Sequence, residues 1–341
     1  MVALSGVTLT QLEAFVLVAR LGSVTAAART LGVSEPAISG ALAALRRQFG
    51  DNLVERTPNG MTLTPGGRRL VGIASQMVAL GAEAEEEIRR ANGAPERLRV
   101  TATNAIAESV APALLAAFQT RAGPTEVSLG LAGSEEMAAV LQERLADVAL
   151  GPRISGPQAS GLECLPLFRY HLVFVVSPEH RLAVAARRLA ASERPPAGQP
   201  PIRLPLLVDE TWLVDPDATD PASPVNQILT RLRVPERNIR VFPSQAAAWA
   251  AAQNTEGIAP AINHLVAAEV ARGSLVTLPV EGMPLELMWY STTLVTDRRS
   301  PSAAAFQRFV ATPDATHAMH TPSSGVPPSR FRPPVYVTIW S

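Results

Sequence analysis

The sequence has no lysine. All thirty of its basic residues are arginines, and they balance thirty acidic residues, so the formal net charge is zero. A neutral chain as a whole shows no preference for nucleic acid or for a membrane surface. The planar guanidinium of arginine suits contacts with phosphate and carboxylate groups, but a genome rich in G and C favours arginine codons in any protein. The missing lysine therefore identifies no partner by itself.

Cysteine is almost missing as well, since Cys164 is alone. One cysteine excludes a disulfide within the chain, a cysteine-based zinc site and a two-cysteine redox switch, and we expect a buried structural thiol. The first residues, MVALSGVTLTQLEAF, lack the basic start and the long apolar stretch of a secretory signal. No segment offers about 20 uninterrupted apolar residues, the length that spans a membrane. We therefore expect a cytoplasmic protein that does not bind a membrane.

The motifs of common enzyme classes are missing too. There is no GxSxG nucleophile elbow, no P-loop, no GxGxxG and no HExxH. The five histidines show no ligand spacing with cysteine; they are His171, His180, His264, His317 and His320. We therefore predict a protein that is not an enzyme and that holds no metal and no cofactor. A fold shared with enzymes would not by itself exclude catalysis.

Charge and helix signals are concentrated in the first seventy residues. This segment holds seven arginines against four acidic residues, a balance of +3, which is a hint of nucleic-acid contact. Apolar spacing predicts helices over 10–21, 24–31 and 35–49, each followed by a glycine. Ser34 is the expected N-cap of the third helix, with its hydroxyl accepting from an otherwise unpaired backbone N–H of the first turn. Pro36 is tolerated in its first turn, because the N–H that proline lacks has no partner there.

The spacing of Ala28, Gly32 and Ile38 matches a helix-turn-helix. A small residue lets the two helices approach, the glycine makes the turn, and the aliphatic side chain fills the angle between the helices. Residues 54–63 then predict two short strands joined by a turn at 58–60, which is a wing. The spacing alone also fits an ordinary unit of three packed helices.

Residues 9–67 resemble the N-terminal domain of LysR-type transcriptional regulators. The matching positions are Leu12, Phe15, Gly22, Ser23, Ala27, Ala28, Leu31, Pro36, Ala37, Ser39, Leu45, Gly50, Leu53, Arg56, Leu63, Thr64 and Gly67. Glu35 stands where the family usually has glutamine, Gly40 where a basic residue is common, and Val54 in place of phenylalanine. Glutamate can accept from cytosine N4 but repels phosphate, so a different base preference and a lower backbone affinity are expected.

The resemblance implies sequence-specific binding of double-stranded DNA by the second helix of the motif. In this geometry the N-terminal turn of that helix lies against base edges in the major groove, and nearby arginines contact phosphates. The residues assigned to DNA binding are Ser34, Glu35, Pro36, Ser39, Gly40, Ala43, Arg29, Arg46, Arg47, Arg56 and Asn59.

A long helix is predicted after the wing. Its apolar residues are spaced 3, 4, 3, 4 and 4 apart, a seam that pairs with another helix; they are Leu70, Ile73, Met77, Leu80, Ala84 and Ile88. In a monomer this seam would pack on its own domain. The resemblance instead implies a homodimer or homotetramer, whose operator would be an interrupted palindrome because site symmetry mirrors protein symmetry.

Strands alternate with helices after residue 95, which predicts a parallel sheet. The resemblance implies a two-lobed α/β domain like a type 2 periplasmic binding protein, with crossings between lobes near 164–168 and 272–280. The expected organisation begins with a mostly α winged helix-turn-helix domain at 1–64 (motif at 24–43), followed by a linker helix at 65–93. An effector-binding domain is expected at 95–312, with lobe I at about 95–164 and 275–312 and lobe II at about 165–274. The proline-rich tail at 313–341 is expected to be disordered.

We expect a small effector between the two lobes. Predicted strands and helix starts deliver hydroxyl groups and amides to this crevice, and such groups suit a carboxylate. The assigned residues are Thr103, Asn104, Gly133, Ser134, Ser244 and Gln245. The competing interpretation is that Ser134 and Ser244 are simply N-caps.

The combined prediction is a DNA-binding transcription regulator whose activity a small molecule modulates. The alternative is an effector-independent repressor whose C-terminal domain only mediates oligomerisation.

Overall fold

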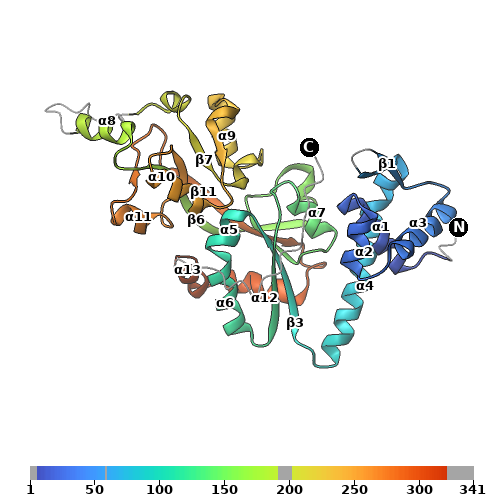
Figure 1. Ribbon diagram of the computed structural model, residues 1–341. Coiled ribbons are helices and arrows are strands. Elements are labelled where there is room, and N and C mark those ends of the chain that lie inside the picture. The colour runs from blue at the N-terminus through green and yellow to red at the C-terminus, as the bar shows by residue number, and fades with distance from the viewer. Residues whose placement is uncertain (1–5, 58–59, 191–201, 321–341) are drawn as a thin grey trace. The chain divides into compact units, whose positions relative to one another are not determined.

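A computed structural model describes residues 6–57, 60–190 and 202–320 (Figure 1). The chain folds into two compact units, one built mainly from residues up to Glu96 and the other mainly from Arg97 onward. Within the described residues, no helix combines the length and the apolar composition that crossing a membrane requires.

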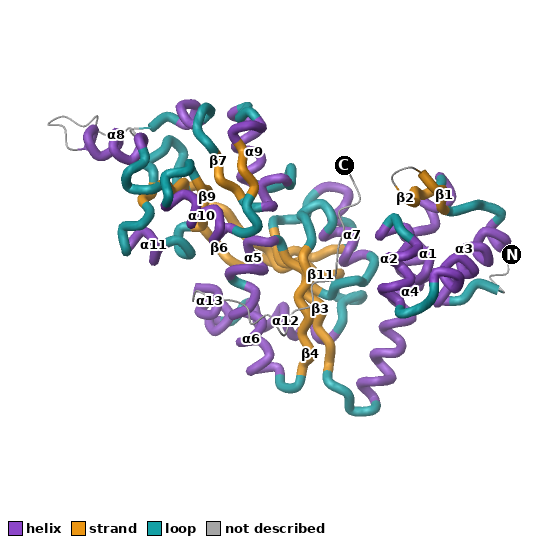
Figure 2. The backbone as a smooth tube through the Cα atoms, in the orientation of Figure 1, coloured by secondary structure: helices purple, strands orange, loops and turns teal. Residues whose placement is uncertain are grey.

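The first unit contains the predicted helix-turn-helix, wing and long helix. Its elements are α1 (Leu9–Leu21), α2 (Val24–Leu31), α3 (Glu35–Phe49), β1 (Val54–Thr57), β2 (Gly60–Leu63) and α4 (Pro65–Ala91). The two strands, seen in Figure 2, pair antiparallel. Val54 lies opposite Leu63. The expected elements are confirmed; Pro58 and Asn59, which were assigned to the turn of the wing, lie outside the described residues.

Local side-chain bonds set the helix starts. The Thr8 hydroxyl accepts from the Gln11 N–H at 3.2 Å, and the Gln11 side chain accepts from the Thr8 N–H at 3.1 Å, which is a capping box. The Ser23 hydroxyl accepts from the Ala26 N–H at 3.2 Å. Ser34 occupies the N-cap position of α3, but its hydroxyl makes no cap hydrogen bond. The prediction of a capping hydroxyl at Ser34 is therefore wrong.

The reason is found in the first turn of α3. Pro36 has no N–H to donate, and the Ala37 N–H bonds to the carbonyl oxygen of Ser34 at 3.0 Å. The side chain of Ser34 is exposed. Its hydroxyl is therefore available to groups outside the helix.

The angle of the helix-turn-helix is filled as predicted. Ile38 is buried against Ala14, Val18, Ala27 and Ala28 in one apolar cluster. The small side chains of the alanines let α2 and α3 approach closely. This cluster fixes the outward face of α3.

The seam of α4 is divided between two environments. Leu70 and Met77 pack against the core of the first unit, as expected for a seam that packs on its own domain. Ile73, Leu80 and Ile88 are instead 59%, 51% and 65% exposed. One apolar stripe of α4 is therefore left on the surface of this unit.

The second unit alternates helices and strands. Its elements are β3 (Glu96–Ala102), α5 (Asn104–Ser109), α6 (Ala111–Ala122), β4 (Thr125–Leu131), α7 (Met137–Gln142), β5 (Val148–Gly151), β6 (Leu162–Val176), α8 (Arg181–Ala190), β7 (Trp212–Val214), the 3-10 turn η3 (Pro216–Thr219), α9 (Pro224–Leu232), β8 (Ile239–Val241), α10 (Gln245–Gln253), β9 (Ala259–Ile262), α11 (Ala267–Ala271), β10 (Val276–Thr277), β11 (Leu285–Leu294), α12 (Pro301–Val310) and α13 (Pro313–His320). Three further 3-10 turns are Gly156–Ala159, Leu204–Leu207 and Glu236–Asn238.

The main sheet is mixed rather than parallel. Its strand order is β10-β6-β11-β5-β3-β4, and β9 also pairs with β6. The parallel prediction holds for β3 with β5 and for the separate pair β7 with β8. It is wrong for β6, which pairs antiparallel with β9, β10 and β11, and for β11 with β5. The long strands β6 and β11 lead the chain out of one lobe and back, so they run in opposite directions.

The lobe crossings lie later in the chain than predicted. On β6, Phe168 belongs to the core of lobe I and Leu172 to that of lobe II. The outward crossing therefore follows the expected segment 164–168. Leu278 lies in the lobe II core, so the chain returns through β11 rather than over 272–280.

The start of the expected disordered tail is a helix. In α13, Ala315 and Met319 are buried in the core of lobe I. The prediction of disorder is therefore wrong for residues 313–320, because these two apolar side chains, four residues apart on one face of the helix, pack into the core of lobe I. The remainder of that segment, 321–341, lies outside the described residues.

Candidate nucleic-acid and ligand sites

The outward face of α3 carries the residues assigned to base contacts. Ser34, Glu35, Pro36, Ser39 and Gly40 are all exposed. On the inward side of the helix, buried apolar residues hold it in the unit. The exposed face consists of small or short side chains, which permit close approach to a base-pair edge. Ala43, also assigned to DNA binding, is half-buried.

Exposed arginines flank this face. Arg29 lies in the last turn of α2, Arg46 and Arg47 lie in the last turn of α3, and Arg56 lies on β1 of the wing. The first three also complement the negative ends of their helix dipoles. Asn59 lies outside the described residues.

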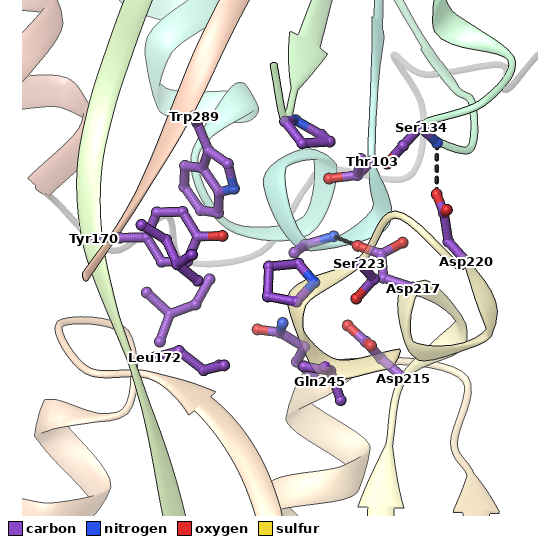
Figure 3. A pocket seen from close by; sticks show the side chains of 16 residues that line it. Thr103, Ser134, Tyr170, Leu172, Asp215, Asp217, Asp220, Ser223, Gln245 and Trp289 are labelled. Atoms are coloured by element: carbon purple, nitrogen blue, oxygen red, sulfur yellow. Dashed lines mark hydrogen bonds between the residues drawn. The ribbon is translucent and has the colours of Figure 1, made fainter. Parts of the chain in front are cut away.

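A cavity of about 70 Å³ lies where the two lobes of the second unit meet (Figure 3). Lobe I contributes Thr103 and Ser134, and lobe II contributes Gln245 and a group of aspartates. The crossing strands supply Tyr170 from β6 and Trp289 from β11. In Figure 3 the two rings lie on one side of the cavity and the aspartates on the other.

Three of the residues assigned to the effector are brought together here. Thr103, Ser134 and Gln245 line the cavity. Asn104 does not line it, and its backbone N–H at the start of α5 donates to Asp217 Oδ1. These residues come from separate segments of the two lobes. The predicted crevice between lobes is therefore present.

The other two assigned residues do not line it. The Gly133 N–H donates to Glu136 Oε2 at 3.3 Å. The Ser244 hydroxyl accepts from the Ala247 N–H at 3.1 Å and caps α10. For Ser244 the N-cap interpretation is correct.

The backbone N–H groups that were expected to bind a carboxylate ligand donate instead to aspartates of the chain itself. The Asn104 and Ala105 N–H groups donate to the two oxygens of Asp217, at 3.1 and 3.0 Å. The Ser134 N–H donates to Asp220 Oδ2 at 2.6 Å. The start of α5 and the loop at Ser134 are thus already bonded to anions from lobe II, as Figure 3 shows.

Asp215 lies deeper than the other two aspartates. It is 7% exposed, and its Oδ2 has no hydrogen-bond partner among the described residues. Burial, followed by the nearby charge of Asp217, raises the pKa of Asp215 to about 7, against a hydrogen bond from Gln245. Burial also raises the pKa of Asp217, opposed by the amides of α5.

Sequence reasoning missed these three aspartates and both aromatic residues. The aspartates stand at spacings of 2 and 3 in DPDATD, within a stretch that composition marks only as a loop. Tyr170 and Trp289 are far apart in sequence, and their ring centroids lie 4.4 Å apart with an interplanar angle of 31°. The repeated acid in a short proline-rich loop was the one available local signal.

Comparison with known families covers both units. Residues 9–68 match the family model described as bacterial regulatory helix-turn-helix protein, lysR family, and residues 91–313 match that described as LysR substrate binding domain.

Related proteins match along nearly the whole chain. An uncharacterised helix-turn-helix-type transcriptional regulator of Mycobacterium tuberculosis (strain CDC 1551) is 34% identical over 333 residues, which cover 97% of this chain and 99% of that protein. The crystal structure of CbnR, a LysR family transcriptional regulator, has a TM-score of 0.57 at 20% identity, covering 92% of this chain and 99% of CbnR. Full-length CbnR in complex with its target DNA gives 0.56 at 20%, covering 89% and 98%.

Proposed function

The chain belongs to the LysR family of DNA-binding transcription regulators, and we propose that a small molecule bound between the lobes of its effector-binding domain controls its action at an operator. We further propose that it acts in the cytoplasm, where bacterial DNA lies. The observation that carries the ligand response is the cavity at the lobe junction, lined by both lobes and by both crossing strands. A ligand there contacts each part that a lobe movement would displace, so it can bind two lobe arrangements with different affinity.

The proposed operator contact is the exposed face of α3, with Ser39 and Glu35 reading base edges and Arg56 on the wing binding phosphate. The exposure of these side chains supports this assignment. CbnR, which has the same fold, has been crystallised with its target DNA. Base contacts specify a sequence, whereas phosphate contacts supply affinity and position.

The proposed assembly is a homodimer or homotetramer that pairs through α4. The exposed apolar stripe of Ile73, Leu80 and Ile88 supports it, because a sustained seam of this kind is stabilised by a second helix. A twofold dimer implies an interrupted palindrome as the operator.

The experiment has two stages and uses the full-length chain. Selection from a pool of random duplexes at physiological salt should yield a sequence with two inverted half-sites. Footprints on that sequence should then change in extent or position when a ligand of the cavity is added, and the double variant Thr103→Val with Ser134→Ala should bind the operator without this response. Equal affinity for all duplexes would refute operator recognition. If no ligand of the cavity changed the footprint, the effector-independent alternative would be favoured.

A further inference from the structure

We propose that the cavity accepts a small organic cation, bearing an amine or guanidinium group, rather than a carboxylate. This inference rests on the proposed ligand response and adds the chemical class of the ligand. It concerns the cavity between Asp215, Asp217 and Asp220 on one side and Tyr170 with Trp289 on the other.

The charge of the lining favours a cation. Three aspartates line the cavity, and none of the described lining side chains is an arginine or a histidine. The sequence holds no lysine that could provide a positive charge. Carboxylates so close together, and withdrawn from water, repel one another. A cation bound among them relieves this repulsion, whereas an anion would increase it.

An independent observation identifies where the cation binds. Asp215 is more than nine-tenths buried, lines the cavity, and has an Oδ2 atom without a hydrogen-bond partner among the described residues. Figure 3 shows its carboxyl group directed towards Asp217. A buried acceptor left without a donor is costly. An ammonium or guanidinium group would supply the missing donor.

The helix amides are not available to an anionic ligand. Asp217 accepts from the Asn104 and Ala105 N–H groups, and Asp220 accepts from the Ser134 N–H. A carboxylate that took these amides would displace Asp217 and leave its half-buried charge without these partners, which is unfavourable. The two aspartates therefore perform, within the chain, the role that a ligand carboxylate was expected to perform.

The opposite wall suits the same ligand class. Tyr170 and Trp289 are 8% and 4% exposed and line the cavity, with the planes of their rings tilted by 31°. Aromatic rings attract a desolvated cation and also accommodate the carbon skeleton attached to it. A volume of about 70 Å³ corresponds to about five water molecules, so the ligand is a compact amine.

The test compares three molecules of the same length and different charge. Isothermal titration calorimetry of the full-length chain at pH 8 uses butylamine, butyrate and 1-butanol. We expect butylamine to bind at least about tenfold more tightly than the other two. Asp215→Asn and Asp217→Asn should each weaken butylamine binding about tenfold or more, and the amide side chain keeps the shape of the carboxyl group in both. Asp314→Asn, which removes one exposed charge on α13, is the matched control and should bind like the wild type.

Three outcomes would overturn the cation assignment: tighter binding of butyrate than of butylamine, no binding of butylamine, or unchanged butylamine affinity in both cavity variants. Tight butyrate binding would leave the proposed ligand response standing. Conversely, butylamine could bind as expected in the calorimeter while neither it nor any other bound amine changes the operator footprint. That result would support the ligand class and refute the ligand response. The two proposals therefore fail separately.

Discussion

The two units of this protein present their candidate binding residues in opposite ways. On α3 of the first unit, Glu35 and Ser39 are exposed and stand on one short stretch of chain. In the second unit, Thr103 and Asp215 are 9% and 7% exposed and lie far apart in sequence. An exposed side chain keeps its water until a partner arrives, whereas a buried one has already lost it. Substitutions in the buried site should therefore change the stability of the second unit, whereas those on the exposed face of α3 should change only the binding of its partner.

The first prediction concerns the exception to this comparison, the apolar stripe exposed on the first unit. Ile73 is 59% exposed, and exposing so much apolar surface to water is unfavourable unless a second helix covers it. Ile73→Asp would place a charge in that seam, where desolvation is costly, and should abolish dimers. Light scattering at micromolar concentration measures the result. Ala82→Asp, exposed at another face of α4, is the control and should leave the dimer intact; a wild-type monomer would exclude pairing through α4.

The second prediction tests the buried site through pH. The pKa of Asp215 is raised to about 7 by burial and by Asp217, with a contribution from Glu108 on α5. The folded state thus holds the proton of Asp215 more tightly than the unfolded state. The stability that this group contributes is fully present below about pH 4 and is lost as the pH rises through about 7. Asp215→Asn cannot ionise, so it should remove this loss, which is at most about 4 kcal/mol.

Urea unfolding at pH 5 and pH 8 measures that effect through tryptophan fluorescence. The described tryptophans all lie in the second unit, at Trp212, Trp249 and Trp289. Asp314→Asn on the exposed surface should retain the wild-type pH dependence. If Asp215→Asn lost as much stability between the two pH values as the wild type, Asp215 would not be the group responsible.

The same contrast explains what could be predicted from the sequence. The helix-turn-helix depends on neighbours within a few residues, such as Ser23 capping α2 and Ile38 filling the angle, so its elements and exposed face were predictable. Even there, Ser34 was assigned a cap bond that it does not make, because the Ala37 N–H bonds to a backbone carbonyl instead. Such a choice between two acceptors is not encoded in residue type.

The ligand site depends on pairing between distant segments. Thr103 and Gln245 were recognisable because they stand near helix starts, but Asp217 bonds to amides more than a hundred residues away. That contact joins lobe I to lobe II, which the chain reaches along β6, and alternating helices and strands do not predict a contact between lobes. The prediction of a carboxylate ligand considered only the backbone amides, and not the side chains of Asp217 and Asp220 that already accept from them.

The third prediction returns to the exposed face. Glu35→Gln restores an amide that can donate and accept at a base edge, and it should change the preferred base at one position of each half-site by about 1–3 kcal/mol. Competition between operator variants, each changed at one base pair, measures the shift. Glu85→Gln, exposed on α4, removes the same charge away from α3 and should leave the preference as in the wild type. An unchanged ranking for Glu35→Gln would remove this residue from the base contacts.

The smallest effect is expected at Arg56, where an exposed guanidinium on β1 of the wing contacts phosphate in the proposed complex. Arg56→Ala should weaken binding to operator and non-operator duplexes by the same factor, since phosphates carry no sequence information. The slope of log affinity against log salt should become shallower by about 0.9 for the one lost contact. Arg231→Ala, exposed on α9 in the second unit, removes the same charge and should leave this slope unchanged. A loss confined to the operator would instead place Arg56 among the base-reading residues, since only a contact to a base edge discriminates between sequences.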